Sequence, residues 1–232
     1  MKERIFQKYQ NSSLGHRRKG MVVFDMDGTL IETKSSWWLI HEAMGTKDQA
    51  RDYERMYRDG TIDYDRWAEL DISTWIGRDF SPALSVLKGV RLMKGARDAV
   101  NLLRSNGFIV GVVSAGLNVV LDQVLKEVSL DFYEANELEL RNNIVVGWKT
   151  RVGYHDKGRK VIELSERFSI PLNRIIVVGD SENDLEMFKL PEVYKIAFLP
   201  SNRELEKLAD VTIREKDLIK VAKVILKKFN SD

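Results

Sequence analysis

Residues 25–30 (DMDGTL) hold the pair of side chains with the clearest capacity for chemistry. Two carboxylates, Asp25 and Asp27, stand two positions apart and directly follow an apolar run. Gly28 permits a tight turn that would bring both carboxylates toward one ligand. Because Asp-Gly is also a common pair in surface turns, this segment alone leaves a functional and a purely structural interpretation open.

Two later segments add groups that could contact an anion. Ser114, followed by Ala115 and Gly116, could present donors to a phosphate oxygen, although alone it is more typical of an ordinary strand-to-helix cap. Lys157 stands at an expected helix start. The helix dipole favours anions there and disfavours a lysine, so the position of Lys157 suggests a functional role. The alternative is a solvated surface lysine.

Residues 179–184 (GDSEND) form the fourth segment. Asp180 and Asp184 stand four positions apart, at an expected strand end and on the following helical turn, with Asn183 between them. This spacing suits a ligand site, but it also suits a capped helix with acidic residues in its first turn.

Three apolar runs must position these groups. They are rich in β-branched residues, lack alternating polarity, and cover residues 21–24, 108–113 and 175–178. Such runs are typical of strands that are buried on both faces of a parallel sheet. Ligands of open parallel sheets bind at the carboxyl ends of the strands, so we expect Asp25, Ser114 and Asp180 to converge there.

Helical patterns separate the later runs, and the alternation predicts an α/β fold with right-handed crossovers. We expect helices over 94–106 (ending at Gly107), 117–128, 157–168, 182–189 and 215–229, and a further strand over 194–199. Residues 34–89 hold no convincing strand and predict a helical insert. Residues 133–152 predict a hairpin that turns at Asn142-Asn143.

Composition narrows the function classes. The chain has 232 residues, 44% of them hydrophobic and 31% charged, which suits one domain carrying a smaller inserted module. It has no cysteine, which excludes disulfides and cysteine metal sites and suggests the cytoplasm. A net charge of +2 argues against nucleic acid as an obligatory partner.

The N-terminal residues and the hydropathy predict neither a membrane span nor a secretory signal, so we expect no membrane partner. No stretch approaches the ~18 apolar residues that a membrane span needs. Residues 1–20 are basic and polar without the apolar centre of a secretory signal, so we interpret them as an N-terminal arm.

In order along the chain, the four segments together resemble the motifs of the haloacid dehalogenase-like superfamily. The resemblance covers residues from about 21 to 229, and the insert resembles the cap of its phosphoserine phosphatase-like branch. It implies a Rossmann-like parallel-sheet core over 21–33 and 90–232, with a helical cap over 34–89.

The resemblance also implies a phosphatase. Asp25 would be the nucleophile that forms an aspartyl-phosphate, and Asp27 the general acid and base. Mg²⁺ would be held by the side chains of Asp25 and Asp180 and the main-chain carbonyl of Asp27, with Asp184 orienting its water shell. Ser114 and Lys157 would hold the phosphoryl oxygens. Ala115 and Asn183 would assist phosphate or substrate binding.

The sequence departs from the branch where the branch recognises phosphoserine. Lys34 stands where a glutamate should be, and Asp71 falls near the place of an arginine, so both charges are reversed. This speaks against phosphoserine, and we hypothesise that Lys34 meets an acidic or hydroxylated part of the substrate. His41 and His155 are more typical of structural or solvent-facing histidines than of catalytic ones.

A capped site favours a small phosphorylated metabolite as substrate. A phosphotransferase or phosphomutase on the same scaffold is the alternative, because fold does not fix function. A non-catalytic binding protein is a third possibility, which the four intact motifs disfavour.

Overall fold

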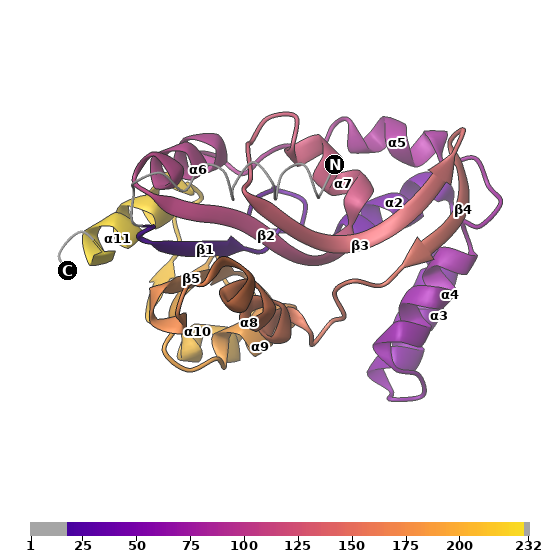
Figure 1. Cartoon of the computed structure of the whole chain (residues 1–232). Helices are drawn as coiled ribbons and strands as arrows, with labels where there is room; N and C mark the ends of the chain where they lie inside the picture. The colour runs from indigo at the N-terminus through magenta and orange to yellow at the C-terminus, as the bar shows by residue number, and fades with distance from the viewer. Residues whose placement is uncertain (1–17, 230–232) are drawn as a thin grey trace.

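The computed structural model describes residues 18–229, so most of the N-terminal arm lies outside the described residues. One seven-stranded sheet runs through the molecule in the order β4-β3-β2-β1-β5-β6-β7 (Figure 1). Its strands are β1 (Gly20–Phe24), β2 (Phe108–Leu117), β3 (Phe132–Arg141), β4 (Ile144–Lys149), β5 (Ile175–Gly179), β6 (Tyr194–Phe198) and β7 (Val211–Ile213). All neighbours pair in parallel except β3 and β4, which confirms the predicted α/β class.

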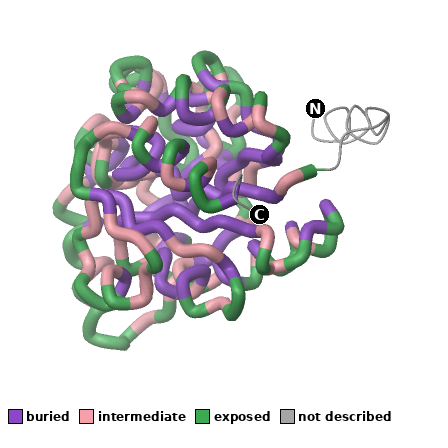
Figure 2. The backbone as a smooth tube through the Cα atoms, turned by 90° about the vertical axis from the view of Figure 1, so that its left-hand side faces the viewer, coloured by how far each residue is buried: buried purple, intermediate pink, exposed green. Residues whose placement is uncertain are grey.

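The apolar runs form the centre of the sheet because both of their faces are covered. Successive residues of a strand point to opposite faces, and β1 contributes Val22 and Phe24 to one hydrophobic core and Met21 and Val23 to the other. Every residue of β1, β2 and β5 is buried, and Figure 2 shows these strands as a buried band between two outer layers.

Helices cover both faces of this sheet. They are α2 (Ser36–Met44), α3 (Lys47–Arg58), α4 (Tyr64–Ser73), α5 (Ser81–Leu87), α6 (Ala96–Ser105), α7 (Asn118–Val124), α8 (Lys157–Phe168), α9 (Leu185–Phe188), α10 (Arg203–Leu208) and α11 (Ile219–Phe229), with 3₁₀ turns at Leu172–Arg174 and Glu182–Asp184. Buried residues of α2, α5, α6, α7 and α11 share the first core, and those of α8, α9 and α10 share the second. Figure 1 shows these two groups on opposite sides of the sheet.

Several predicted boundaries differ from the structure. The strand predicted over 108–113 continues to Leu117, because β3 pairs alongside it through a register shift. The helix predicted over 117–128 is correspondingly the shorter α7. α11 begins at Ile219 rather than 215, because the Asp217 side chain accepts a hydrogen bond from the Ile219 amide (3.2 Å) and caps it.

Residues 34–89 contain α2 to α5 and no named strand, and we call this range the helical insert. α3 and α4 pack against each other and extend beyond the sheet on the side of α8 (Figure 1). Ser35 and Asp63 cap α2 and α4, accepting hydrogen bonds from the amides of Trp38 (3.3 Å) and Arg66 (2.8 Å).

The predicted hairpin is confirmed in β3 and β4. Asn142 and Asn143 join the two strands with φ of 49° and 63°, the backbone that a two-residue hairpin turn requires. The hairpin also holds the insert, because the amides of Gly77 and Phe80 donate to the carbonyls of Val145 (2.8 Å) and Asn143 (2.7 Å). The insert is therefore attached to the rest of the chain in two ways: through its two chain connections and through these hydrogen bonds to the hairpin.

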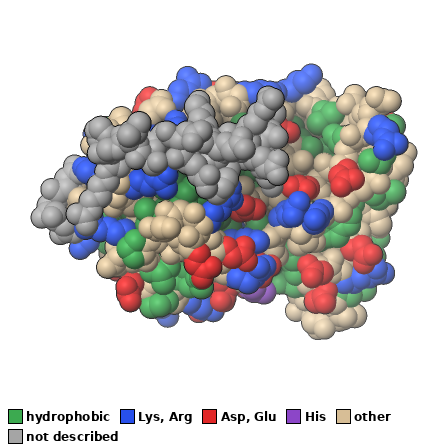
Figure 3. All heavy atoms as spheres, in the orientation of Figure 1, with side chains coloured by type: hydrophobic (Ala, Val, Ile, Leu, Met, Phe, Trp, Pro, Cys, Tyr) green, Lys and Arg blue, Asp and Glu red, His purple; other side chains and the backbone are tan. Residues whose placement is uncertain are grey.

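Within residues 18–229, no helix combines the length and the apolar character that crossing a membrane would require. On the face drawn in Figure 3, acidic and basic side chains are interspersed rather than gathered by sign.

Candidate active site

The loop after β1 lies against the end of β5. The Asp25 amide donates to the Val178 carbonyl (2.9 Å), so the two strands stay paired up to the site. Gly28 then turns the chain with φ of 76°, and a Cβ at this position would lie 2.6 Å from an Asp180 carboxylate oxygen. Only glycine permits both the turn and this close approach.

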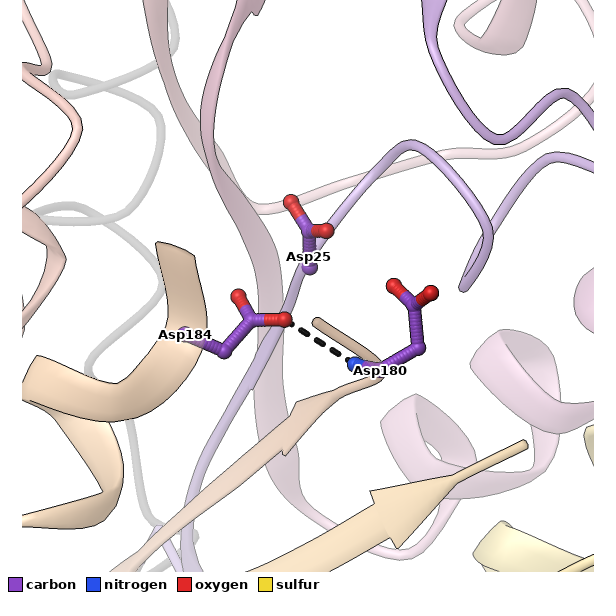
Figure 4. A group of neighbouring side chains, drawn as sticks. All are labelled: Asp25, Asp180 and Asp184. Carbon is purple, nitrogen blue, oxygen red and sulfur yellow. Dashed lines mark hydrogen bonds between the residues drawn. The ribbon is translucent and has the colours of Figure 1, made fainter. Parts of the chain in front are cut away.

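At the end of β5, a glycine again makes room for a carboxylate. A Cβ on Gly179 would lie 2.4 Å from the carboxyl carbon of Asp184, so the absence of a side chain makes room for that carboxylate. Asp184 Oδ2 accepts from the amides of Asp180 (2.9 Å) and Ser181 (3.1 Å). Figure 4 shows the first of these bonds, with the side chain of Asp25 beside those of Asp180 and Asp184.

Lys157 is fully buried in the centre of the site, although it is the first residue of α8. Its Nζ donates to Asp25 Oδ1 (2.6 Å), to Asp184 Oδ1 (2.6 Å) and to Asn183 Oδ1 (2.9 Å). Burial opposes its charge, but Asp184 and Asp25 outweigh this and raise the pKa of Lys157 above its usual value. The lysine therefore stays charged and fixes the carboxylate of Asp25.

Carboxylate oxygens of Asp25, Asp180 and Asp184 lie within 4.8 Å of one another. Burial, reinforced by the charge of Asp184, raises the pKa of Asp25 well above its usual value and that of Asp180 to about 7. One lysine thus leaves negative charge uncompensated, and hard oxygen donors of this kind suit Mg²⁺. Because Asp184 already receives three hydrogen bonds, Asp25 and Asp180 are the carboxylates best placed to hold such an ion.

Asp27 is held from the insert. Its Oδ2 accepts from both the amide and the hydroxyl of Ser36, each at 2.7 Å, at the first residue of α2. Its Oδ1 is buried without a hydrogen-bond partner among the described residues. Burial raises the pKa of Asp27, and the two bonds from Ser36 oppose that rise. A carboxyl group in this environment can carry a proton to a substrate oxygen.

Ser114 and Ala115 lie at the far end of β2, which the structure brings beside the Asp25 loop. The Ser114 hydroxyl accepts from the Gly116 amide (3.0 Å). The Ala115 carbonyl receives the indole N–H of Trp37 (3.2 Å), the Tyr64 hydroxyl (3.4 Å) and the Asn136 amide group (2.9 Å). The insert therefore binds directly to the segment that carries Ser114.

One cavity joins this site to the insert. Its lining combines predicted site residues with side chains of α2, α3 and α4: Asp25, Asp27, Lys34, Ser35, Trp37, Trp38, His41, Ala50, Tyr64, Trp67, Ala68, Asp71, Ser114, Ala115, Gly116, Tyr154, Ser181 and Asn183. Lys34 lines it as an exposed side chain, and its charge is one of the influences that lower the pKa of Asp180. Trp75 is fully buried and stacks on Trp37, with ring centroids 5.7 Å apart.

The two histidines differ in place. His41 is buried inside the insert, with its Nδ1 2.7 Å from the Thr46 hydroxyl and its Nε2 3.3 Å from Asp71 Oδ1. His155 is exposed, with its Nε2 3.4 Å from the Tyr57 hydroxyl. Neither is hydrogen-bonded to Asp25 or Asp27.

The sequence did not single out Ser36, Asn136 or Tyr154 for the site. Ser36 follows a capping serine at a helix start, and Tyr154 stands three positions before Lys157, so proximity to the motifs was a usable signal for both. Asn136 gave no signal, because its side chain ties together the Ala115 and Val152 carbonyls and the Arg151 and Val152 amides, which meet only in the folded chain.

Known proteins resemble this chain in sequence and in fold. A sequence model of the haloacid dehalogenase-like hydrolases matches residues 22–189, and one of sucrose-6F-phosphate phosphohydrolases matches residues 154–225. The phosphoserine phosphatase of Streptococcus thermophilus is 31% identical over 210 residues, which cover 89% of this chain and 96% of that protein. Phosphoserine phosphatase SerB2 of Mycobacterium tuberculosis is 28% identical over 187 residues, 80% of this chain but 46% of that protein.

The chain thus spans about half the length of the SerB2 relative, and 63% of the similar phosphoserine phosphatase of Archaeoglobus fulgidus. Among solved structures, a phospho-aspartyl intermediate analogue of phosphoserine phosphatase superposes with a TM-score of 0.76 at 23% identity, covering 90% of this chain and 99% of that one. At this identity the superposition shows a shared fold.

Proposed function

The chain belongs to the haloacid dehalogenase-like hydrolases, in their phosphoserine phosphatase-like branch, and we propose that it is a magnesium-dependent phosphatase acting through Asp25. The observation that carries the proposal is the triple contact of Lys157, which fixes Asp25 in the lining of a cavity that a second, protonatable carboxyl group, Asp27, also lines. Its substrate is a small phosphorylated metabolite. The relatives named as phosphoserine phosphatases support the reaction class.

In the first step, a carboxylate oxygen of Asp25 attacks phosphorus while the bond from phosphorus to the leaving oxygen breaks. Asp27 gives its proton to that oxygen, so the product alcohol leaves neutral. Lys157, the Ser114 hydroxyl and the side chain of Asn183 line the place where the phosphoryl oxygens gain charge.

In the second step, Asp27, now a carboxylate, takes a proton from water, and the oxygen of that water attacks phosphorus. The bond between Asp25 and phosphorus breaks, which releases inorganic phosphate and restores the Asp25 carboxylate. The bonds from Ser36 keep Asp27 in one orientation through both steps.

Mg²⁺ would be held by Asp25 and Asp180, with the main-chain carbonyl of Asp27 as a further ligand and Asp184 behind them. When bound, it supplies positive charge that offsets the repulsion between these carboxylates and the phosphate.

The helical insert acts as a cap in this proposal, and the core comprises residues 21–33 and 90–232. Its helices supply one wall of the cavity and reach Ala115 through Trp37 and Tyr64. A wall of this kind excludes bulk water and limits the size of the leaving group. We place the activity in the cytoplasm, where phosphorylated metabolites are retained by their charge.

The test is hydrolysis of p-nitrophenyl phosphate with and without Mg²⁺, with Asp25→Asn as the inactive control. We expect phosphate release only with the metal and only with Asp25, and a ³²P-labelled protein intermediate trapped by acid in the wild type. Equal release by the wild type and Asp25→Asn would refute the proposal.

A further inference from the structure

Besides the catalytic carboxylates, the cavity is lined by aromatic rings and by one further carboxylate, which together we call the aromatic wall. Trp37, Trp38 and Tyr64 line it together with Trp67 and Tyr154. Asp71, on α4, lines the same cavity and is only 4% exposed. Neither the catalytic steps nor the phosphate contacts use these groups, so they are available to bind the leaving part of the substrate.

Three buried polar atoms in this part of the cavity lining lack a hydrogen-bond partner among the described residues. They are the carboxylate oxygen Oδ1 of Asp71, the indole N–H of Trp67 and Nε2 of His41. His41 Nε2 is 3.3 Å from Asp71 Oδ1, but the contact does not have hydrogen-bond geometry. An unpaired buried acceptor costs free energy until a ligand supplies a donor.

Thr46 contacts the ring nitrogen of His41 that does not face Asp71. The indole N–H of Trp75 donates to the Thr46 hydroxyl (3.1 Å), which leaves the hydroxyl its own proton to donate. His41 Nδ1 lies 2.7 Å from this hydroxyl and can accept that proton. This arrangement corresponds to the neutral tautomer of His41 with its proton on Nε2. In it, the histidine places no full positive charge beside the Asp71 carboxylate.

Among the described residues that line the cavity, Lys34 is the one lysine or arginine, and it acts on Asp180, at the phosphate end. A carboxylate on the substrate near Asp71 would meet aromatic rings and a group of its own charge. A cation there would meet a carboxylate and several electron-rich ring faces, which attract ammonium groups.

We propose that this wall selects a phosphorylated amino alcohol, whose primary or methylated ammonium group binds Asp71 between the aromatic rings. The inference rests on the proposed phosphatase activity and names the substrate class of the same site. The phosphate end sits on Lys157 and Ser114, and the ammonium end sits in the insert. A carboxylate beside the ammonium group is unfavourable in this arrangement.

The test compares kcat/KM of the whole protein with Mg²⁺ for phosphoethanolamine, phosphocholine, phosphoserine and glycerol phosphate. We expect phosphoethanolamine or phosphocholine to exceed both of the others about tenfold or more. Asp71→Asn should lower the ratio of the preferred ester to glycerol phosphate by a similar factor. Asp65→Asn, an exposed position on the same helix, removes the same charge and should leave the ratio unchanged.

Glycerol phosphate or phosphoserine hydrolysed as well as the amino alcohol esters would overturn the inference, and so would an unchanged ratio in Asp71→Asn. The wild-type comparison decides the matter even where the variant does not fold. If p-nitrophenyl phosphate is hydrolysed without any preference among the four esters, only this inference fails. If no ester is hydrolysed at all, the proposed function fails with it.

Discussion

Replacing Lys157 by methionine tests whether the buried ion network holds the site together. The side chain is completely buried and its Nζ contacts two carboxylates at 2.6 Å. Methionine has a similar length but no charge, so Asp25 and Asp184 would lose their shared cation. Removing one partner of a buried ion pair costs about 3–5 kcal/mol, because the other charge stays buried and uncompensated. For a chain of this size that corresponds to a decrease in Tm of roughly 6–20 °C.

The assay is urea unfolding of the metal-free protein near pH 8, followed by circular dichroism. Lys189→Met is the matched control, since Lys189 pairs with Glu186 at the surface with its side chain 49% exposed. Exposed pairs contribute ~0–1 kcal/mol, so this variant should unfold almost as the wild type does. Adding Asp184→Asn to Lys157→Met should recover part of the loss, because one buried charge is removed. Equal stability of Lys157→Met and Lys189→Met would refute the reasoning.

Three further predictions concern the acid, the loop and the insert. Asp27→Asn should lower kcat by about 10²–10⁴ for alkyl phosphates and by less for p-nitrophenyl phosphate, whose leaving group needs little protonation; equal losses for both esters would contradict the acid role. Gly28→Ala should abolish most activity and lower Tm by roughly 2–12 °C through strain. Gly60→Ala has a similar φ of 72° but open space around it, so it should keep its activity. Burial raises the pKa of Asp71, so the folded protein keeps the Asp71 carboxyl proton to a higher pH than the unfolded chain does. Stability therefore falls as the pH rises from the pKa of the unfolded chain through that of the folded protein. The Tm of Asp71→Asn relative to wild type should therefore increase between pH 4 and 7 in thermal scans, and a constant difference would contradict the assignment.

The central strands could be predicted because burial on both faces leaves an unbroken apolar run. β1 and β5 follow this rule, and the end of each run located Asp25 and Asp180. The short α10 and β7 were not predicted, since six and three residues carry too little periodicity to stand out. The extension of β2 to Leu117 depends on its partner β3, which a local pattern does not contain.

The site residues, too, could be predicted only in part. Residue types and spacing indicated the carboxylates, but the partners of Lys157 are set by the fold, since Asp25 lies 132 positions away in the chain. From the sequence, Asp71 was notable only because it reverses the charge expected near that position. Its burial beside a histidine that Thr46 orients depends on the packing of three helices, which the sequence does not reveal.

The tryptophans give the molecule an optical property. Four of the five, Trp37, Trp38, Trp67 and Trp75, belong to the helical insert, and the fifth, Trp148, lies on β4. Three of the four line the cavity, so the indole fluorescence of the whole protein reports mainly on the insert and on what enters beneath it. Binding of a non-hydrolysed ligand, and any movement of α3 and α4 that accompanies it, can therefore be followed by emission in real time, without a label and without turnover.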